Sequence, residues 1–248
     1  MLEIDNLMVF FENALAINGL SLTVNRGEIV GIIGSNSAGK TTLMNTVSGL
    51  IIDMRVKEKR KGGQRITVYG KVMFEGRDIT ELPPGRRVRM GIVLSRERHP
   101  VFPESSVLEN FKIAGYLRKK AEIEEKIHQV FELFPALQRL QHRKAGFLSG
   151  GEQQMLAIGM ALVVRPRLLL LDEPLLGLSP MMQKAVVDAI VALRSETGIT
   201  VVVCEQFARP VLPIIDRGYV VENGMLALDG TGEELMDNFE IKSAYFGI

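Results

Sequence analysis

The stretch GEIVGIIGSNSAGKTT, residues 27–42, decides the fold. It starts with a continuous apolar run, passes through a loop of glycines and small residues, and leads into helix-compatible sequence. Residues 34–41 fit the pattern G-x-x-x-x-G-K-[ST], placed after a buried strand and before a helix. Glycines in such a loop let backbone N–H groups face phosphate oxygens, and the helix N-terminus adds partial positive charge. The stretch therefore predicts a phosphate-binding strand, loop and helix.

Individual residues of this loop have predicted roles. We expect Lys40 to reach the β and γ phosphates of a nucleotide and the Thr41 hydroxyl to bind Mg²⁺. If the position of Ser37 needs a positive φ, its Cβ brings a strain of about 1 kcal/mol, which the fold can tolerate. The predicted phosphate-binding residues are Gly34, Ser35, Asn36, Ser37, Ala38, Gly39, Lys40, Thr41 and Thr42.

Length and charge narrow the class of protein. The 248 residues suit one large domain, and 30 Lys and Arg against 29 Asp and Glu leave no strongly basic surface. No nucleic-acid partner is therefore expected. The single cysteine, Cys204, excludes an internal disulfide framework. The apolar stretch 155–164 is shorter than the ~18 residues of a membrane-spanning helix, and the acidic N-terminus does not resemble a secretory signal. We expect the chain to stay in the cytoplasm.

Two further runs, 168–173 and 199–205, are also continuously apolar until they end in acids. Strands of this kind are buried on both faces, as in a parallel sheet covered by helices. The shorter alternating segments 15–24 and 66–74 predict an antiparallel layer beside this sheet.

The remaining patterns predict a helical lobe and a C-terminal hairpin. Between residues 100 and 147 apolar side chains recur at helical spacing. Further on, Asn223-Gly224 separates two apolar runs, which is a strong hairpin signal, and Thr231 with Glu234 predicts a capping box at the start of a last helix.

Asp172 and Glu173 close the second apolar run. An acid that leaves a parallel strand beside a phosphate loop can hold the Mg²⁺ shell, which is the predicted role of Asp172. Glu173 lies where a carboxylate could orient or deprotonate an attacking water. Taken alone, such acids would by default cap a helix or lie on the surface; the phosphate loop favours the catalytic interpretation.

Residues 148–154, LSGGEQQ, precede an apolar-rich helix and predict a second anion-binding corner. The chain thus offers two phosphate cradles but one lysine loop. The economical explanation is that two chains meet head to tail, each lending this corner to the nucleotide of the other. The predicted nucleotide-contacting residues of the corner are Ser149, Gly150, Gly151 and Glu152.

The phosphate loop, the LSGGE sequence and the Leu-Leu-Leu-Leu-Asp-Glu run, in this order and spacing, resemble the ATP-binding cassette (ABC) ATPases over essentially the whole chain. The resemblance implies an α/β fold of the P-loop NTPase type, with a mainly parallel core sheet flanked by helices, an antiparallel β layer and a helical lobe. It also implies ATP and Mg²⁺ as ligands and a single domain, with 1–99 and 148–248 as the core and 100–147 as the lobe.

An aromatic residue near the N-terminus stacks on adenine in that family. The matching position is Phe11, with Phe10 as the neighbouring candidate. Both could instead be strand core, so this assignment stays open.

Several phrases are similar to one branch, the shorter of the paired ATPases of branched-chain amino-acid importers. These phrases are 172–180, 204–208, 216–224 and the ending 242–247. The resemblance implies a second ATPase subunit, related or identical, two transmembrane permease subunits and an extracellular or periplasmic solute-binding protein. It places the chain peripherally on the cytoplasmic face of the membrane, with the surface from Glu97 to Tyr116 passing motion to the permease.

Three positions depart from the broad family pattern. Glu97 stands where the family usually has glutamine, and it could still bind Mg²⁺ or its water. Gln206 replaces the switch histidine; an amide can sense a γ-phosphate but cannot carry a proton. Ser179 replaces an aspartate. With Lys40 and Glu173, Gln206 completes the predicted catalytic set, and Thr41, Glu97 and Asp172 form the predicted metal set.

Residues 53–65, DMRVKEKRKGGQR, look like an insertion relative to that family. Its basic residues could attract anionic lipid or a partner, but we expect a solvated hairpin or loop with Gly62-Gly63 at its tip.

The sequence therefore predicts the ATP-hydrolysing motor subunit of an importer. Only the resemblance implies that the transported substrates are branched-chain amino acids. Two other functions stay open: a soluble ABC ATPase that acts on ribosomes or DNA, and a nucleotide-gated scaffold that does not hydrolyse ATP. The sequence does not decide whether the opposite cassette is a second copy or a related chain.

Overall fold

A computed structural model describes residues 1–97, 100–116 and 118–238. The C-terminal phrase 242–247 and residues 98–99 of the predicted permease-facing surface lie outside the described residues. The strands are β1 (Leu2–Phe11), β2 (Ala14–Val24), β3 (Ile29–Ile33), β4 (Ile66–Phe74), β5 (Arg77–Asp78), β6 (Ile92–Ser95), β7 (Leu168–Asp172), β8 (Thr200–Glu205), β9 (Arg217–Glu222) and β10 (Met225–Gly230).

The α-helices are α1 (Lys40–Ser48), α2 (Leu50–Lys61), α3 (Pro84–Met90), α4 (Val107–Ala114), α5 (Lys120–Leu133), α6 (Pro135–Arg139), α7 (Gly150–Val163), α8 (Pro180–Thr197) and α9 (Gly232–Asp237). Two short 3₁₀ turns are η1 (Ala145–Phe147) and η2 (Leu212–Ile214).

The core sheet has the strand order β10-β9-β3-β8-β7-β6. Its strands are parallel except for β10, which pairs antiparallel with β9. Every residue of β3, β7 and β8 is buried, as the continuous apolar runs predict. The second sheet, β2-β1-β4-β5, is antiparallel and forms the predicted β layer.

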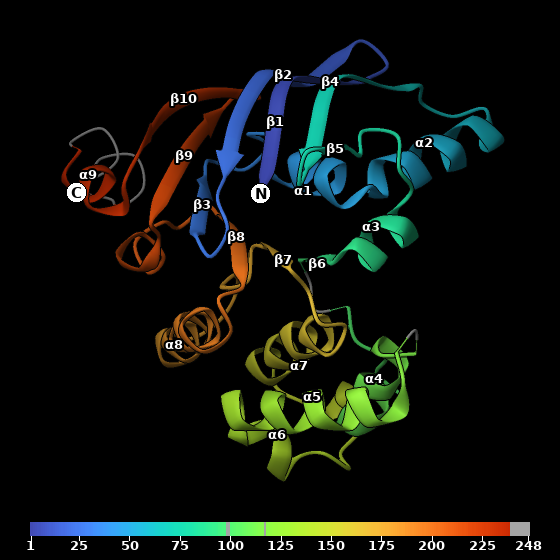
Figure 1. Ribbon diagram of the computed structural model, residues 1–248, viewed down its shortest axis with the longest axis vertical. Helices are drawn as coiled ribbons and strands as arrows, with labels where there is room; N and C mark the ends of the chain where they lie inside the picture. Colours follow the sequence, from blue (N-terminus) through green and yellow to red (C-terminus); the bar gives the residue numbers. More distant parts are fainter. Residues whose placement is uncertain (98–99, 117, 239–248) are drawn as a thin grey trace.

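Alternate residues of the core strands feed two hydrophobic clusters. On β3, for example, Val30 and Ile32 pack with α1 and the antiparallel sheet, whereas Ile29 and Ile33 face the cluster that includes α7, α8 and the helical lobe. Figure 1 shows the resulting layers, with the antiparallel sheet at one end of the molecule and helices α4 to α7 at the other.

The helical lobe contains the predicted α5, whose residues Ile123, Ile127, Val130 and Phe131 are buried. Helix α7 packs against α4, α5 and α6, and it also contacts β6 and β7 of the core sheet. It therefore joins the lobe to the sheet, and the division of the chain at residue 148 stays a prediction.

The C-terminal hairpin forms as expected. Asn223 and Gly224 have φ values of 49° and 78°, as a two-residue turn between β9 and β10 requires. Thr231 caps α9, and its capping box with Glu234 is complete.

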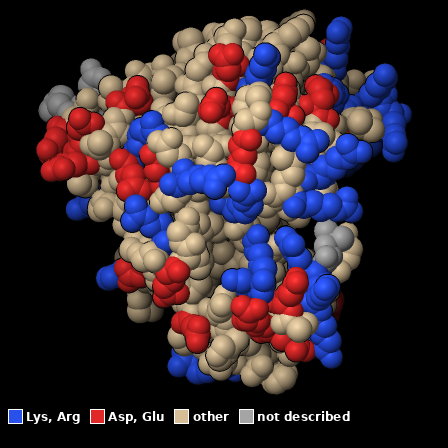
Figure 2. Space-filling model, in the orientation of Figure 1, with Lys and Arg blue, Asp and Glu red and all other residues tan. Residues whose placement is uncertain are grey.

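The prediction of a hairpin or loop at residues 53–65 is wrong, because α2 extends through Lys61. Ile51 and Ile52 bury its first turn, and the long charged side chains that follow favour a helix. Gly62, with a φ of 65°, ends the helix as a left-handed cap instead of forming a loop tip. Figure 2 shows Lys and Arg side chains gathered over the edge of the molecule where α2 lies.

Candidate nucleotide site

The phosphate loop connects the buried end of β3 to the start of α1. Its conformation needs positive φ at Ser37 (67°) and Gly39 (103°). A Cβ at Gly39 would lie 2.7 Å from the carbonyl oxygen of Ala16, so only glycine fits there. The Gly224 N–H donates to the carbonyl of Ala38 at 3.0 Å, so the β9-β10 turn braces the loop. The strained Ser37 agrees with the strain expected from the sequence.

A cavity of about 520 Å³ opens over this loop. Its volume is in the range of small-molecule sites. The residues that line it are Ala16, Asn36, Ser37, Gly39, Lys40, Thr41, Thr42, Glu97, Glu173 and Leu176.

Lys40 lies at the centre of the polar contacts in this site. Its Nζ donates to the carbonyl oxygens of Gly34 at 2.7 Å and Ser35 at 3.0 Å, and it lies 3.0 Å from Oε1 of Glu173. The side chains of Lys40 and Glu173 are only 4% and 8% exposed. The ammonium group is thus surrounded by three oxygens of the protein.

The acids at the end of β7 take separate places. Asp172 accepts a hydrogen bond from the Thr41 hydroxyl at 3.4 Å. Burial raises the pKa of Asp172 to about 6, with the nearby charges of Glu173 and Glu97 adding to the rise and the Thr41 hydrogen bond opposing it. Of the predicted metal set, Thr41 and Glu97 thus line the cavity, and Asp172 contacts it through the Thr41 hydroxyl.

Glu173 is held from the neighbouring strand as well. Its backbone N–H donates to the carbonyl of Cys204 at 3.0 Å, and its Oε2 accepts the backbone N–H of Gln206 at 3.3 Å. Gln206 thus reaches the site through its backbone.

Glu205 is a residue of the site to which sequence reasoning assigned no role. Its side chain is buried, and its Oε1 accepts the Leu175 N–H at 2.8 Å. Burial raises its pKa to about 8, and the charge of Glu173 adds to the rise. The available signal was an acid at the exit of an otherwise apolar strand.

Phe11 does not line the cavity. It is partly buried and packs against the hydrophobic cluster between the two sheets, while Phe10 contacts Tyr69 edge to face with ring centroids 6.1 Å apart. Ala16 and Leu176 line the cavity instead, and neither carries a sequence signal. The adenine contact of Phe11 stays a prediction.

Ser149 and its glycines do not line the cavity either. Ser149 is the N-cap of α7: its Oγ accepts the Glu152 N–H at 3.4 Å, and its own N–H donates to Oε2 of Glu152 at 2.8 Å. Ser149 and Gly150 are exposed, so the corner faces outward from the chain.

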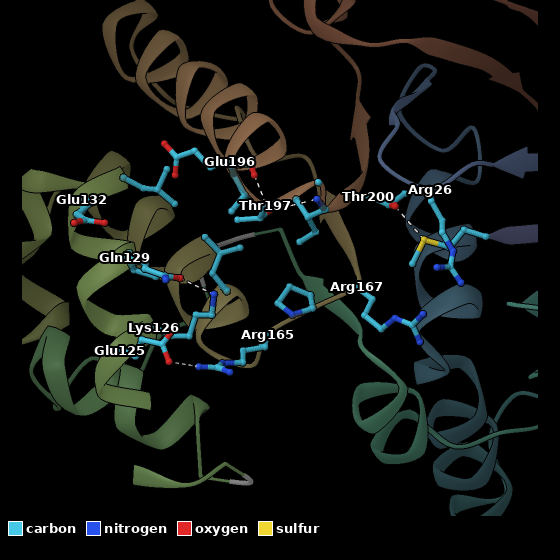
Figure 3. A pocket seen from close by; sticks show the side chains of 18 of the residues that line it. Arg26, Glu125, Lys126, Gln129, Glu132, Arg165, Arg167, Glu196, Thr197 and Thr200 are labelled. Atoms are coloured by element: carbon cyan, nitrogen blue, oxygen red, sulfur yellow. Dashed lines mark hydrogen bonds and ion pairs between the residues drawn. The ribbon is translucent and has the colours of Figure 1, made fainter. Parts of the chain in front are cut away.

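A second cavity, of about 600 Å³, lies between α5, the end of α8 and the start of β7 (Figure 3). Its arginines face acids of the cavity wall: Arg165 pairs with Glu125 at 2.5 Å, and both Arg26 and Arg167 pair with Glu75. This larger cavity has no glycine-rich loop. The smaller cavity over the phosphate loop is therefore the better candidate for a phosphate site.

A family model described as "ABC transporter" matches residues 17–176. The chain belongs to the ABC transporter family. The match contains the phosphate loop, the LSGGE corner and the acids Asp172 and Glu173. ATPase cassettes of this family bind and hydrolyse ATP, so this ABC ATPase is an enzyme.

Full-length relatives support the same family. The chain is 38% identical over 247 residues to the high-affinity branched-chain amino acid transport ATP-binding protein BraG of Pseudomonas aeruginosa, with 100% of both chains covered. It is 35% identical to the probable branched-chain amino acid transport ATP-binding protein LivF of Archaeoglobus fulgidus, with 91% of this chain and 89% of that one covered.

The fold of the ABC ATPase agrees with solved cassettes. One is an ATP-binding cassette of an ABC transporter in its ADP conformation, with a TM-score of 0.83, 29% identity and coverage of 100% of this chain and 99% of that chain. The predicted fold class, the ABC ATPase family and the resemblance to ATP-binding proteins of branched-chain amino acid transport are thus confirmed. No helix among the residues that the structure describes is long and apolar enough to cross a membrane.

Proposed function

We propose that this ABC ATPase is the motor subunit of an importer for branched-chain amino acids. The observation that carries the proposal is its end-to-end similarity to a relative named for that transport. In this proposal the subunit lies peripherally at the cytoplasmic face of the membrane. It works with a second ATPase subunit, two permease subunits and, through them, an extracellular or periplasmic solute-binding protein.

The phosphate loop fits a nucleoside triphosphate. The restricted space at Gly39 keeps side chains out of the loop, and Lys40 already has oxygen partners in the position that phosphates would take. Lys40 would bind the β and γ phosphates, and backbone N–H groups of residues 34–42 would bind the remaining oxygens.

The donor set beside Lys40 also fits Mg²⁺. Thr41 and Asp172 offer hard oxygen ligands, and Glu97 lines the same cavity. No three His, Cys, Asp or Glu side chains within 1–97, 100–116 and 118–238 form a ready-made metal site. This agrees with Mg²⁺ held by few protein ligands together with substrate phosphates. When bound, the ion would neutralise charge on the phosphates.

The second cassette would complete the site. Ser149 and Gly150 are exposed at the start of α7, where helix N–H groups attract anions. Glu152 bonds to the Ser149 N–H in this chain, so a γ-phosphate would compete with that carboxylate. ATP would thus draw two cassettes together, each contributing its corner to the nucleotide of the other.

Hydrolysis in this arrangement depends mainly on position and charge. Lys40 and the opposing Ser149 would stabilise the γ-phosphate while Glu173 orients the attacking water and accepts its proton. Gln206 would sense the γ-phosphate through its amide. Loss of the γ-phosphate would then reopen the pair of cassettes, and the surface from Glu97 to Tyr116 would pass the motion to the permease.

The test is Glu173→Gln in the assembled complex. We expect the variant to bind ATP and assemble, but to release phosphate at least about 100-fold more slowly, because general-base catalysis contributes about 10²–10⁴-fold. Glu222→Gln, at the exposed end of β9, is the matched control. Parental phosphate release by Glu173→Gln would disprove the assignment of Glu173, and absence of release from the parent complex would favour the scaffold.

The transported substrate needs a separate test. The complex should be purified from the native membrane with its bound subunits, and ATP turnover measured with leucine, isoleucine or valine and the solute-binding protein. Stimulation by these amino acids but not by a charged amino acid is expected. Co-purification with ribosomes or DNA instead would contradict the importer assignment.

A further inference from the structure

Helix α2 carries a cluster of cations to which the proposed function gives no role. Between Val56 and the end of the helix, the exposed side chains are this valine and four cations, Lys57, Lys59, Arg60 and Lys61. We call these four cations the basic tip. Because the whole chain has a formal net charge of only +1, the basic tip concentrates positive charge at one place on an otherwise balanced molecule.

The charges of the basic tip are not neutralised within the chain. Among residues 1–97, 100–116 and 118–238, no acid forms an ion pair with any of the four cations. Arg55, one turn earlier, does have such a partner in Glu81. Glu58 is half-buried and turns back toward the end of the helix, since a Cβ at Gly63 would lie 2.2 Å from its Oε2. The four cations therefore face solvent.

Such a cluster works against the stability of the helix. Lys57 and Lys61 are four residues apart, so their side chains are neighbours on one face and repel each other. The helix dipole favours cations in the last turn, which holds Lys59, Arg60 and Lys61. The dipole does not account for Lys57 or for the missing acid partners. A ligand of opposite charge would offset the repulsion.

The position of α2 connects the basic tip to the predicted permease-facing surface. Helix α2 packs against α3, and α3 packs against β6, after which Glu97 begins that surface. Figure 1 shows α2, α3 and α4 along the same side of the molecule. Arg86 and Arg89 are exposed on α3 and extend the positive surface in this direction. If this side meets the permease, the basic tip lies at its rim, next to the bilayer.

The chemistry of the basic tip favours a lipid surface as its partner. Three of the four cations are lysines, whose ammonium groups are point charges on flexible stems and do not need the fixed geometry of a bidentate site. Residues 50–65 contain no aromatic side chain on which a nucleic-acid base could stack. Val56, 43% exposed among the cations, is suited to the boundary between headgroups and acyl chains. Anionic headgroups attract polybasic segments of this kind.

We propose that the basic tip of α2 binds the anionic phospholipid surface of the membrane beside the permease. The inference rests on the proposed function for the membrane that lies next to this side of the molecule. It goes beyond that function, because it gives the ATPase a direct contact with lipid in addition to its contacts with permease subunits. Such a contact would hold the subunit at the membrane through charge.

Flotation of the purified chain with lipid vesicles tests the proposal. Vesicles of phosphatidylglycerol and phosphatidylcholine should bind the chain, and vesicles of phosphatidylcholine alone should not. Each cation near an anionic surface strengthens binding about 5-fold, so Lys57→Gln, Lys59→Gln and Lys61→Gln combined should weaken binding about 100-fold. Glutamine is a good helix former, so α2 should stay intact. Parental binding should fall steeply between about 0.1 M and about 1 M salt, because the Debye length shrinks from about 10 Å to about 3 Å.

The matched control removes the same charge from other places on the surface. It replaces with glutamine three exposed lysines that already have acid partners: Lys120 with Glu124, Lys144 with Glu104 and Lys184 with Asp188. Vesicle binding by this control should stay within about 3-fold of the parent, because charges beyond a Debye length from the lipid are screened. Thermal unfolding verifies that both triple variants fold.

Three results would overturn the proposal: equal binding to both kinds of vesicle, no binding to the anionic vesicles, or a loss of binding in the α2 variant no larger than in the control. Retention of the chain on polyglutamate or duplex DNA, without binding to anionic vesicles, would assign the basic tip to an acidic protein segment or a nucleic acid instead.

Phosphate release by the assembled complex in detergent, without a bilayer, keeps the two proposals apart. The α2 variant should release phosphate at the parental rate there, because α2 does not line the nucleotide cavity. Absence of release from the parent would count against the motor function, whereas flotation of the chain does not depend on hydrolysis.

Discussion

Arg87 gives the sharpest test of how the phosphate-loop helix is held. It lies on α3 with 0% exposure, and its guanidinium donates to four backbone carbonyls. Two belong to the C-terminal end of α1, Thr46 at 2.7 Å and Val47 at 2.9 Å, and two to Leu82 at 2.8 Å and Thr80 at 2.9 Å. A cation at this end of α1 also interacts favourably with the helix dipole.

The stability that Arg87 contributes follows from two opposing free energies, the gain from its hydrogen bonds and the cost of burying its charge. Hydrogen bonds to a charged group contribute about 1.5–3 kcal/mol each, so four contribute at least about 6 kcal/mol. Burial lowers the pKa of Arg87 from 12.5 to about 10, so the group remains charged at neutral pH, at a desolvation cost of about 3 kcal/mol. Arg87→Met therefore removes about 3 kcal/mol or more of stability, which lowers Tm by at least about 6 °C in a chain of this size.

Thermal unfolding followed by circular dichroism measures this effect. Arg86→Met is the control, because Arg86 is exposed on the same helix and should shift Tm by about 1 °C or less. Arg87→Lys keeps the charge but loses the planar guanidinium, so its Tm should lie between those of Arg87→Met and Arg86→Met. A Tm for Arg87→Met within 2 °C of the parent, on the order of the error of a surface substitution, would refute the reasoning.

Three further outcomes are expected. Gly39→Ala should weaken binding of a fluorescent ATP analogue by about 5- to 150-fold, because strain of about 1–3 kcal/mol at φ 103° opposes the loop; unchanged binding would contradict the fit at Gly39. Ser37→Gly should instead raise Tm by about 1–3 °C by relieving strain at φ 67°, and a lower Tm would count against it. Because the pKa of Glu205 is raised to about 8, the folded protein holds a proton that the unfolded chain releases above about pH 4.5. The stabilisation from this bound proton is therefore complete at low pH and is lost as pH rises toward 8. Glu205→Gln should flatten the decline in the free energy of unfolding between pH 6 and 8. Urea unfolding at each pH measures this decline.

The sequence was most informative where a single interaction dominates. Continuous apolar runs identified β3, β7 and β8, because a strand buried on both faces has no polar face to show. The loop at Gly39 was equally clear, since its backbone conformation and close approach to Ala16 admit only glycine. In these places local sequence and global fold impose the same requirement.

The sequence was less informative where tertiary contacts decide the local structure. Charged residues 53–61 fit a solvated loop as well as a helix, and only the packing of Ile51 and Ile52 selects the helix. The buried Glu205 side chain accepts its hydrogen bond from Leu175, which is 30 residues away in the chain. Ala16 lines the cavity because of how two sheets meet, and no periodicity reports that.

Helix α2 continues directly from α1 through one glycine, Gly49, and Arg87 clamps the carbonyls just before that joint. Its 12 residues span roughly 18 Å. A tilt of α1 by about 5° would then displace the tip at Lys61 by roughly 1.5 Å, given that span. Helix α2 thus amplifies small movements of α1. A spin label at the exposed end of α2 would report small movements of the phosphate-loop helix on ATP binding as measurable changes in distance.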